Sequence, residues 1–97
     1  GDHRDLHSFL HDALPIYRVI LALAAYNIGI GHLKDAFLIS ESVGMNPYHW
    51  NQLKTVLPKL AEHEYYKNTK WGQARGSETV EYVEKTKAYF HYLVSAN

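Results

Sequence analysis

One apolar stretch constrains the fold more than any other part of the sequence. It reads YRVILALAAYN from Tyr17 to Asn27 and carries a single charged side chain, that of Arg18. A segment that is apolar nearly all round is typical of a buried helix or a buried strand. Its alanines favour helix, because alanine is a strong helix former and a poor strand former. We therefore predict a buried central helix that ends at Gly29 and Gly31, since glycine ends helices without steric penalty.

Two helices are predicted after this break. The first covers His32 to Val43, and the second covers Tyr48 to Leu57 with Asn46 as its N-cap and Pro58 ending or kinking it. The predicted inner face of the first is Leu33, Ala36, Phe37 and Ser40. The predicted buried positions of the second are Trp50, Leu53, Val56 and Leu57.

A loop and a last helix complete the chain. The segment from Ala61 to Gly76 has no clear periodicity and is rich in aromatic residues, so we expect an ordered loop that forms a binding surface. The last helix covers Glu78 to Ser95, with Ser77 as its N-cap. Its predicted apolar stripe is Val80, Val83, Phe90, Leu93 and Val94. All predicted elements are helical, which indicates an all-α fold, a small helical bundle.

Composition excludes some classes of function. The 97 residues include 10 basic and 10 acidic side chains, so the formal charge is zero and nothing favours nucleic acid as a partner. There is no cysteine, hence no disulfide framework. The longest apolar run, Val19 to Ala25, is far shorter than the roughly 20 residues that span a membrane. Small domains bury a limited core, so we expect marginal stability.

The first sixteen residues, Gly1 to Ile16, allow three interpretations. His3, His7 and His11 are spaced for one helix face, which is the spacing of helical zinc sites, although such spacing alone is weak support for a metal. A frayed polar terminus is the second interpretation. The third is that codons for these residues reproduce a widely used sequencing adaptor with one cytosine missing. We prefer the third, so we predict that residues 1–16 are translated adaptor rather than a domain, and that genuine protein begins near Tyr17.

Three motifs occur in order in the rest of the chain. They are AAYNIGIG from Ala24 to Gly31, WGQARG from Trp71 to Gly76, and ETVEYV from Glu78 to Val83. The first and third resemble the AAYNxGxG and ETxxYV motifs of the family 1 lytic transglycosylases, which share the goose-type lysozyme fold, and the second is similar to a YGYARG stretch of membrane-bound members of that family. The resemblance covers Val19 to about Val94, and it is closest to the membrane-bound members of that family. It implies that residues 17–97 are the C-terminal part of a lytic transglycosylase catalytic domain.

The resemblance implies cleavage of the bond between N-acetylmuramic acid and N-acetylglucosamine in peptidoglycan. In the family, one glutamic acid protonates the leaving oxygen and then acts as base while the muramic C6 hydroxyl attacks, which gives a 1,6-anhydro product. That glutamate lies upstream of the AYN motif, in an ES motif, and no Glu precedes Tyr26 here. The Glu41–Ser42 pair follows the motif and is no substitute. We therefore expect no catalytic residue in this chain, and no activity of the chain alone.

The resemblance assigns supporting roles to a few residues. Tyr26 would support the catalytic carboxyl and bind sugar, although a tyrosine at the end of a buried helix can also be a core residue. Asn27 would bind sugar or cap its helix, and Glu78 would line the cleft or simply favour the helix dipole. Tyr65 and Tyr66, with Trp71 nearby, would stack on sugar or pack. Arg75 would pair with a peptide carboxylate or a nearby Glu, while Tyr82 is predicted to pack.

The expected partner is the peptidoglycan glycan strand, with neither cofactor nor metal. The resemblance implies a periplasmic enzyme associated with the outer membrane of a Gram-negative bacterium, with membrane association only through upstream parts. Two other functions remain open. One is a non-catalytic helical module that binds glycan or a partner, and the other is a goose-type lysozyme-like hydrolase. Fold likeness alone does not decide among them.

Overall fold

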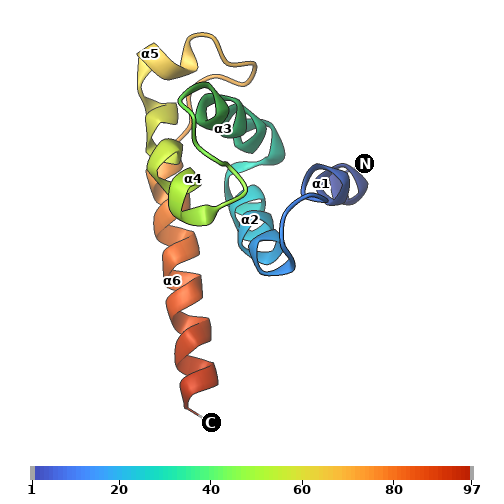
Figure 1. Cartoon of the computed structure of the whole chain (residues 1–97). Helices are drawn as coiled ribbons and strands as arrows, with labels where there is room; N and C mark the ends of the chain where they lie inside the picture. Colours follow the sequence, from blue (N-terminus) through green and yellow to red (C-terminus); the bar gives the residue numbers. More distant parts are fainter. Residues whose placement is uncertain (1, 97) are drawn as a thin grey trace.

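A computed structural model describes the backbone of residues 2–96 and the side chains of residues 6–96. The described residues form helices and connecting loops with no strand, which confirms the all-α class (Figure 1). The elements in order are α1 (Asp2–Phe9), α2 (Pro15–Ile28), α3 (Ile30–Ser42), α4 (Trp50–Val56), the 3-10 helix η1 (Leu57–Ala61), α5 (His63–Tyr66) and α6 (Gly76–Ser95).

The predicted central helix is α2, but it is buried on one side only. Leu21, Ala24 and Ala25 are buried, whereas Val19 is 64% exposed and Tyr26 is 83% exposed. The expectation of burial all round was therefore wrong, because within the described chain α2 contacts its neighbours along one face. The helix begins at Pro15, whose ring suits the first helical turn.

A single glycine turns the chain from α2 into α3. Gly29 has a φ of +95°, a value that L side chains rarely adopt, and its N–H donates to the carbonyl of Ala25 at 2.8 Å. The two helix axes differ by 120° across this residue. Gly31 was also expected in the break, but it lies in the first turn of α3.

The inner face of α3 matches the prediction. Its four predicted positions, Leu33, Ala36, Phe37 and Ser40, are all buried, and the hydroxyl of Ser40 donates to the carbonyl of Ala36 at 2.8 Å. Asp35 is also buried, at 2% exposed, which the apolar periodicity gave no reason to expect.

The α4–η1 segment supplies the middle of the core. Trp50, Leu53, Val56 and Leu57 are buried as predicted, and the chain tightens into η1 where Pro58 occupies the first turn. The prediction that Asn46 is the N-cap was wrong. Helix α4 begins at Trp50, and the side chain of Asn46 accepts a hydrogen bond from the N–H of Tyr48 at 3.0 Å.

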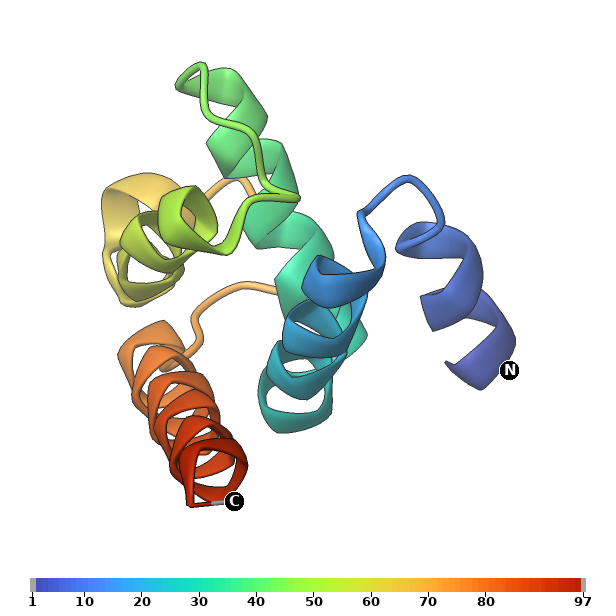
Figure 2. The same cartoon turned by 60° about the horizontal axis from the view of Figure 1, so that its bottom comes forward.

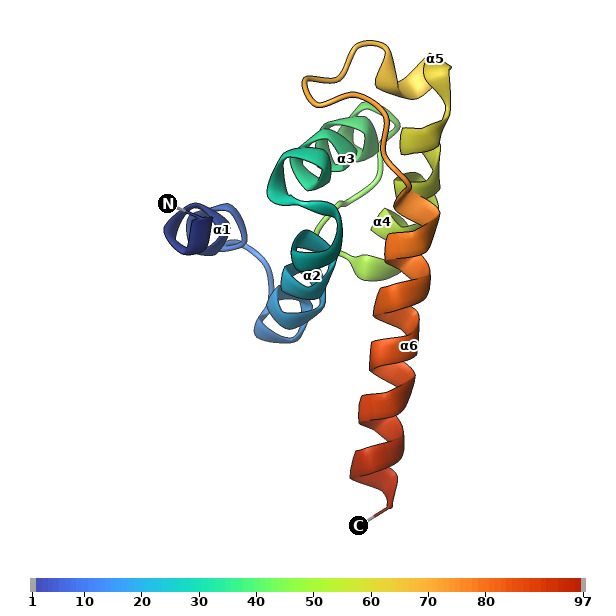
Figure 3. The same ribbon diagram turned by 180° about the vertical axis from the view of Figure 1, so that it is seen from behind.

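Helix α6 is half in the globule and half outside it. It begins at Gly76 with Arg75 in the N-cap position, so the expected capping by Ser77 was wrong. Val83 is buried, but Phe90 is 67% and Val94 is 59% exposed, so the predicted apolar stripe is largely exposed to solvent beyond Val83. The C-terminal turns extend away from the other helices (Figure 1, Figure 3).

Helix α1 lies at the side of the molecule, next to α2 and α3 (Figure 2). The rings of Phe9 and Phe37 are 4.6 Å apart, and Leu10 and Ala13 are buried in the core. The guanidinium of Arg18 donates to the carbonyl of Ala13 at 2.8 Å, which ties the α1–α2 turn to α2. Within the described residues no single helix is long and apolar enough to cross a membrane, although the bent α2–α3 pair meets that test jointly.

Candidate functional site

A cavity of about 220 Å³ lies where the end of α2 meets the start of α6. The beginning of α3 and the segment before α6 close its other sides. Its lining combines residues from all three sequence motifs or their flanks: Asn27, Ile28, His32, Ala74, Arg75, Glu78 and Thr79. The fold therefore brings together segments that are about fifty residues apart in the chain, as the hydrogen bond between Asn27 and Thr79 shows.

That hydrogen bond is the direct link across the cavity wall. The hydroxyl of Thr79 donates to Oδ1 of Asn27 at 2.7 Å, and Thr79 is 1% exposed. Asn27 itself is exposed, so its amide nitrogen stays available to donate to a ligand. Its side chain does not cap α2, because Gly29 ends that helix through backbone contacts.

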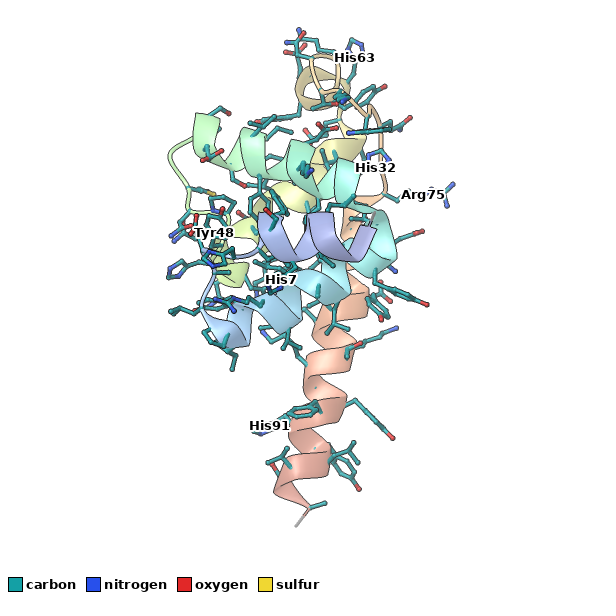
Figure 4. All side chains as sticks on the ribbon, turned by 90° about the vertical axis from the view of Figure 1, so that its right-hand side faces the viewer. His7, His32, Tyr48, His63, Arg75 and His91 are labelled. Carbon is teal, nitrogen blue, oxygen red and sulfur yellow. The ribbon has the colours of Figure 1, made fainter. Side chains whose placement is uncertain are left out.

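Two charged side chains flank the opening. Arg75 and Glu78 form an ion pair with a 3.6 Å separation between Nη1 and Oε1, and their side chains are 84% and 65% exposed. Such exposed pairs contribute little to stability, so both groups are free to exchange partners. Figure 4 shows Arg75 extending away from the body of the protein. The nearby Glu expected as a partner of Arg75 is thus Glu78.

His32 is a cavity residue that the sequence interpretation missed. It was predicted only as the first residue of a helix, yet it lines the cavity, and its Nδ1 is buried without a hydrogen-bond partner among the described residues. Histidine spacing carried no signal for this position. Its place directly after the AYNIGIG segment is the feature that points to it, since the turn at Gly29 directs the start of α3 toward α6.

A second, wider depression of about 410 Å³ lies along α6 and shares Glu78 with the first. Its other lining residues are Glu81, Tyr82 and Lys85. The hydrogen bond from Lys85 lowers the pKa of Glu81, and the same bond raises the pKa of Lys85. Glu81 is therefore anionic near neutral pH and suited to binding rather than to donating a proton. Tyr82 is half-buried against the core, as predicted.

Tyr26 has a different environment from the one that was expected. It precedes Asn27 in the AYN motif but lines neither cavity, and 83% of it is exposed to solvent. The structure thus brings Asn27 and Glu78 to one cavity and leaves the phenol of Tyr26 outside it. A core role for Tyr26 does not fit this exposure.

Tyr65 and Tyr66 lie on the short helix α5, within a segment that was expected to be a loop. Tyr65 is half-buried against the core, with Nζ of Lys59 at 4.7 Å from its ring centroid, and the ring of Tyr66 packs edge-on against His63 at 5.3 Å. Neither lines the two cavities. Their role in sugar binding stays a prediction.

Two other groups bear on the chemistry. Glu41 is exposed near the end of α3 and lines neither cavity. No group of three potential metal ligands occurs in the part of the chain with described side chains, a part that includes His7 and His11 but not the side chain of His3. The described site thus offers amide, hydroxyl, imidazole and ionic groups around an open cavity, an arrangement suited to binding a polar ligand.

Comparison with known proteins agrees with this arrangement of motifs. The chain is 51% identical over 92 residues to the membrane-bound lytic murein transglycosylase F of Shewanella frigidimarina, which covers 94% of the chain and 19% of that relative. It is 47% identical over 92 residues to the protein of that name in Shewanella woodyi, with the same shares. It is 48% identical over 79 residues to that of Desulfosudis oleivorans, covering 81% of the chain and 17% of the relative. No family model matches the chain.

The matched segment therefore places the chain among the lytic murein transglycosylases. Within them, it belongs to the membrane-bound lytic murein transglycosylase F family. The chain spans about a fifth of the length of these relatives. Because the Shewanella frigidimarina match covers 94% of the chain, it must include some of residues 1–16. The Desulfosudis match covers 81% of the chain, so it can lie within residues 17–97 alone.

Proposed function

We propose that this chain forms one wall of the glycan-binding cleft in a peptidoglycan lytic transglycosylase. The whole enzyme cleaves the bond between N-acetylmuramic acid and N-acetylglucosamine and releases a 1,6-anhydro product. The observation that carries this proposal is the cavity shared by Asn27 and Glu78, which come from two separate motifs. The names of the relatives supply the substrate, murein.

The proposed reaction needs one carboxyl group that changes its protonation state twice. A glutamic acid donates its proton to the glycosidic oxygen, which breaks the bond at the anomeric carbon. The resulting carboxylate then takes the proton of the muramic C6 hydroxyl as that oxygen bonds to the same carbon, so no water is consumed. This differs from glycosidases that use two carboxylates. No cofactor takes part in this sequence of proton transfers.

The catalytic glutamate is proposed to lie in the part of the enzyme that precedes this sequence. No Glu precedes Tyr26 here, and the Glu41 carboxylate lies outside both cavities. The chain alone would then bind glycan and leave it intact. Tyr26 is proposed to support that absent carboxyl, because its exposed phenol lies next to the cavity residue Asn27 in the sequence and is free to meet a group from outside the described chain.

The remaining assignments follow from the same proposal. Asn27 and Glu78 bind sugar hydroxyl or acetamido groups, and Arg75 exchanges its exposed pairing with Glu78 for a peptide carboxylate. Tyr65 and Tyr66 stay candidates for a more distant sugar contact. The enzyme would act on peptidoglycan in the periplasm at the outer membrane, and its membrane association would come from upstream parts. Nucleic acid is not a proposed partner.

The test compares two proteins on purified murein sacculi, with mass spectrometry of the soluble products. One is the 97-residue chain, and the other is residues 17–97 joined behind the preceding part of the Shewanella frigidimarina relative. We expect no muropeptides from the first and anhydro-muropeptides from the second. Products with reducing ends would instead indicate a hydrolase, and binding without turnover by the joined protein would indicate a non-catalytic module.

Variants of the joined protein test the individual roles. Tyr26→Phe removes only a hydroxyl, and Glu78→Gln removes only a charge. Each should lower the rate of anhydro-muropeptide release by about tenfold or more, equivalent to about 1.4 kcal/mol of transition-state stabilisation. Tyr89→Phe is the matched control, because Tyr89 is exposed on the projecting part of α6 and lines neither cavity. Unchanged rates in both test variants would remove these residues from the site.

A further inference from the structure

The two tryptophans of this chain have opposite environments. Trp50 is 1% exposed in the core, whereas Trp71, in the segment between α5 and α6, is 55% exposed. An exposed indole gains little from folding, because much of its apolar surface stays in water. The structure nevertheless holds Trp71 in one place through three contacts, and these contacts suggest a purpose for its exposed surface.

A buried carboxyl group fixes the backbone of Trp71. Asp35, which is 2% exposed, accepts the N–H of Trp71 at 2.8 Å through Oδ2 and the N–H of Lys70 at 3.3 Å through Oδ1. Burying a carboxyl group is costly unless hydrogen bonds compensate it. Its hydrogen-bond partners among the described residues are these two amides, so Asp35 is placed to anchor the 70–71 backbone onto α3, over which this segment passes (Figure 3).

Gly31 fixes the indole ring itself. A Cβ added at Gly31 would lie 2.6 Å from Cε2, 2.7 Å from Cδ2 and 2.7 Å from Nε1 of Trp71. Nearly equal distances to three ring atoms indicate that a face of the indole, rather than its edge, lies against Gly31. Any larger residue would displace the ring. Nζ of Lys70 lies 5.4 Å from the ring centroid, and because Lys70 is exposed, a ligand can displace this cation.

Two short segments of the chain connect the anchored ring to residues of the cavity. Gly31, which supports the ring, immediately precedes the cavity residue His32, and Trp71 is three positions before the cavity residue Ala74. A glycan strand bound at the cavity would therefore pass near the indole. Aromatic faces are suited to packing against the apolar faces of sugar rings, and a side chain that is already immobilised loses little entropy on binding.

We propose that Trp71, held by Asp35 and Gly31, is a preorganised stacking platform that binds one N-acetylated sugar of a glycan strand beyond the cavity. The choice of glycan as the ligand rests on the proposed function. The platform itself rests on the three contacts. Asp35 and Gly31 act as positioning residues, and Trp71 makes the contact with the sugar.

The test uses the full 97-residue chain and the soluble β-1,4 tetramer of N-acetylglucosamine as the probe. Iodide quenching of tryptophan fluorescence reports Trp71 selectively, because Trp50 is 1% exposed and out of reach of the ion. We expect the tetramer to protect Trp71 from quenching in a saturable manner. Trp71→Ala should weaken tetramer binding, measured by calorimetry, by about tenfold. Trp71→Phe should weaken it less, because an aromatic face remains.

Two further variants separate positioning from contact. Gly31→Ala and Asp35→Asn both keep the indole, but each should release it, so iodide quenching without ligand should rise and tetramer binding should weaken about threefold to tenfold. Tyr92→Ala is the matched control, since Tyr92 is an exposed aromatic residue, 69% exposed, on the projecting end of α6. Its tetramer binding should equal that of the unchanged chain.

The outcomes distinguish this inference from the proposed function. Tetramer binding that is unaffected in Trp71→Ala, or no binding by the unchanged chain at millimolar tetramer, overturns the stacking platform. Neither result bears on anhydro-muropeptide release by the joined protein, which tests the proposed function by itself. A protected Trp71 together with weakened binding in Trp71→Ala supports the platform even if the joined protein releases no anhydro product.

Discussion

The hydroxyl of Thr79 donates a 2.7 Å hydrogen bond to Oδ1 of Asn27, and this bond joins the start of α6 to the end of α2. The two residues lie on the wall of the same cavity. One belongs to the AAYNIGIG motif and the other to the ETVEYV motif. The bond therefore sets the distance between the two motifs in the folded chain.

This bond should contribute measurably to folding. In a double-mutant cycle of Thr79→Val, Asn27→Ala and the double variant, we expect a coupling energy of about 0.5–1.5 kcal/mol, the usual net value of a hydrogen bond. Urea unfolding followed by circular dichroism measures it. A coupling energy near zero would mean that the two helices are held at this point by apolar packing alone.

Glu84 should make stability depend on pH. Its pKa is lowered mainly by the hydrogen bond from Lys54 at 2.9 Å, with burial opposing and the Trp50 indole N–H, at 3.1 Å, adding to the effect. Because the pKa of Glu84 is lower in the folded state, its ionised carboxylate stabilises the fold fully above pH 4.5, the ordinary pKa of the group. This stabilisation is lost as the pH falls through the lowered pKa.

Glu84→Gln tests this directly, since a glutamine can still accept the indole N–H. At pH 7 the variant should be less stable than the unchanged chain by about 0.5–1 kcal/mol, and the difference should shrink in acid. Urea midpoints at pH 7 and pH 3 measure both. Glu62→Gln is the control, because Glu62 is exposed and has no ion pair among the described contacts. A pH-independent difference would contradict the proposed charge effect.

Gly76→Ala should be the most disruptive small substitution in the chain. A Cβ at Gly76 would overlap the backbone carbonyl of Leu57, in η1, and backbone atoms there cannot yield as a flexible side chain would. We expect a loss of about 3 kcal/mol or more, seen as a much lower midpoint of thermal unfolding. Ser77→Ala, at the exposed neighbouring position, should change stability by about 0.5 kcal/mol or less. Similar midpoints for both variants would contradict the close η1–α6 contact.

The origin of residues 1–16 is best tested in DNA. We propose that they are translated adaptor, because codons that can encode them reproduce an adaptor with a single missing cytosine. Genomic sequence across the Ile16–Tyr17 junction should then encode different residues before Tyr17. Finding the present codons in the genome would show that α1, with its Phe9–Phe37 contact, is part of the natural protein.

Local patterns predicted the fold in outline. The apolar run ending at Gly29, the buried face of α3 and the core positions of α4 all follow from periodicity and glycine placement, which are properties of neighbouring residues. Helix ends were less predictable. Ser77 and Asn46 have the right chemistry for capping, but the helices begin elsewhere because Gly76 packs on Leu57 and Asn46 binds Tyr48.

The site was predictable only where a motif marked it. Asn27 and Glu78, each marked by a motif, line one cavity, but His32 and Thr79 join them through contacts between distant segments that no local pattern contains. Asp35 is the clearest case: its partners are the backbone amides of Lys70 and Trp71, and backbone amides have no residue-specific signature in the sequence.

The projecting end of α6 has a dynamic consequence. Beyond Val83 the described helix has no fully buried residue, so its hydrogen bonds there depend more on helix propensity than on core packing. Amide hydrogens near Thr79 should exchange with solvent only when the whole molecule opens, whereas those after Tyr89 should exchange orders of magnitude faster through local fraying. The molecule thus has a gradient of rigidity along one continuous helix, firm at the cavity and loose at its tip.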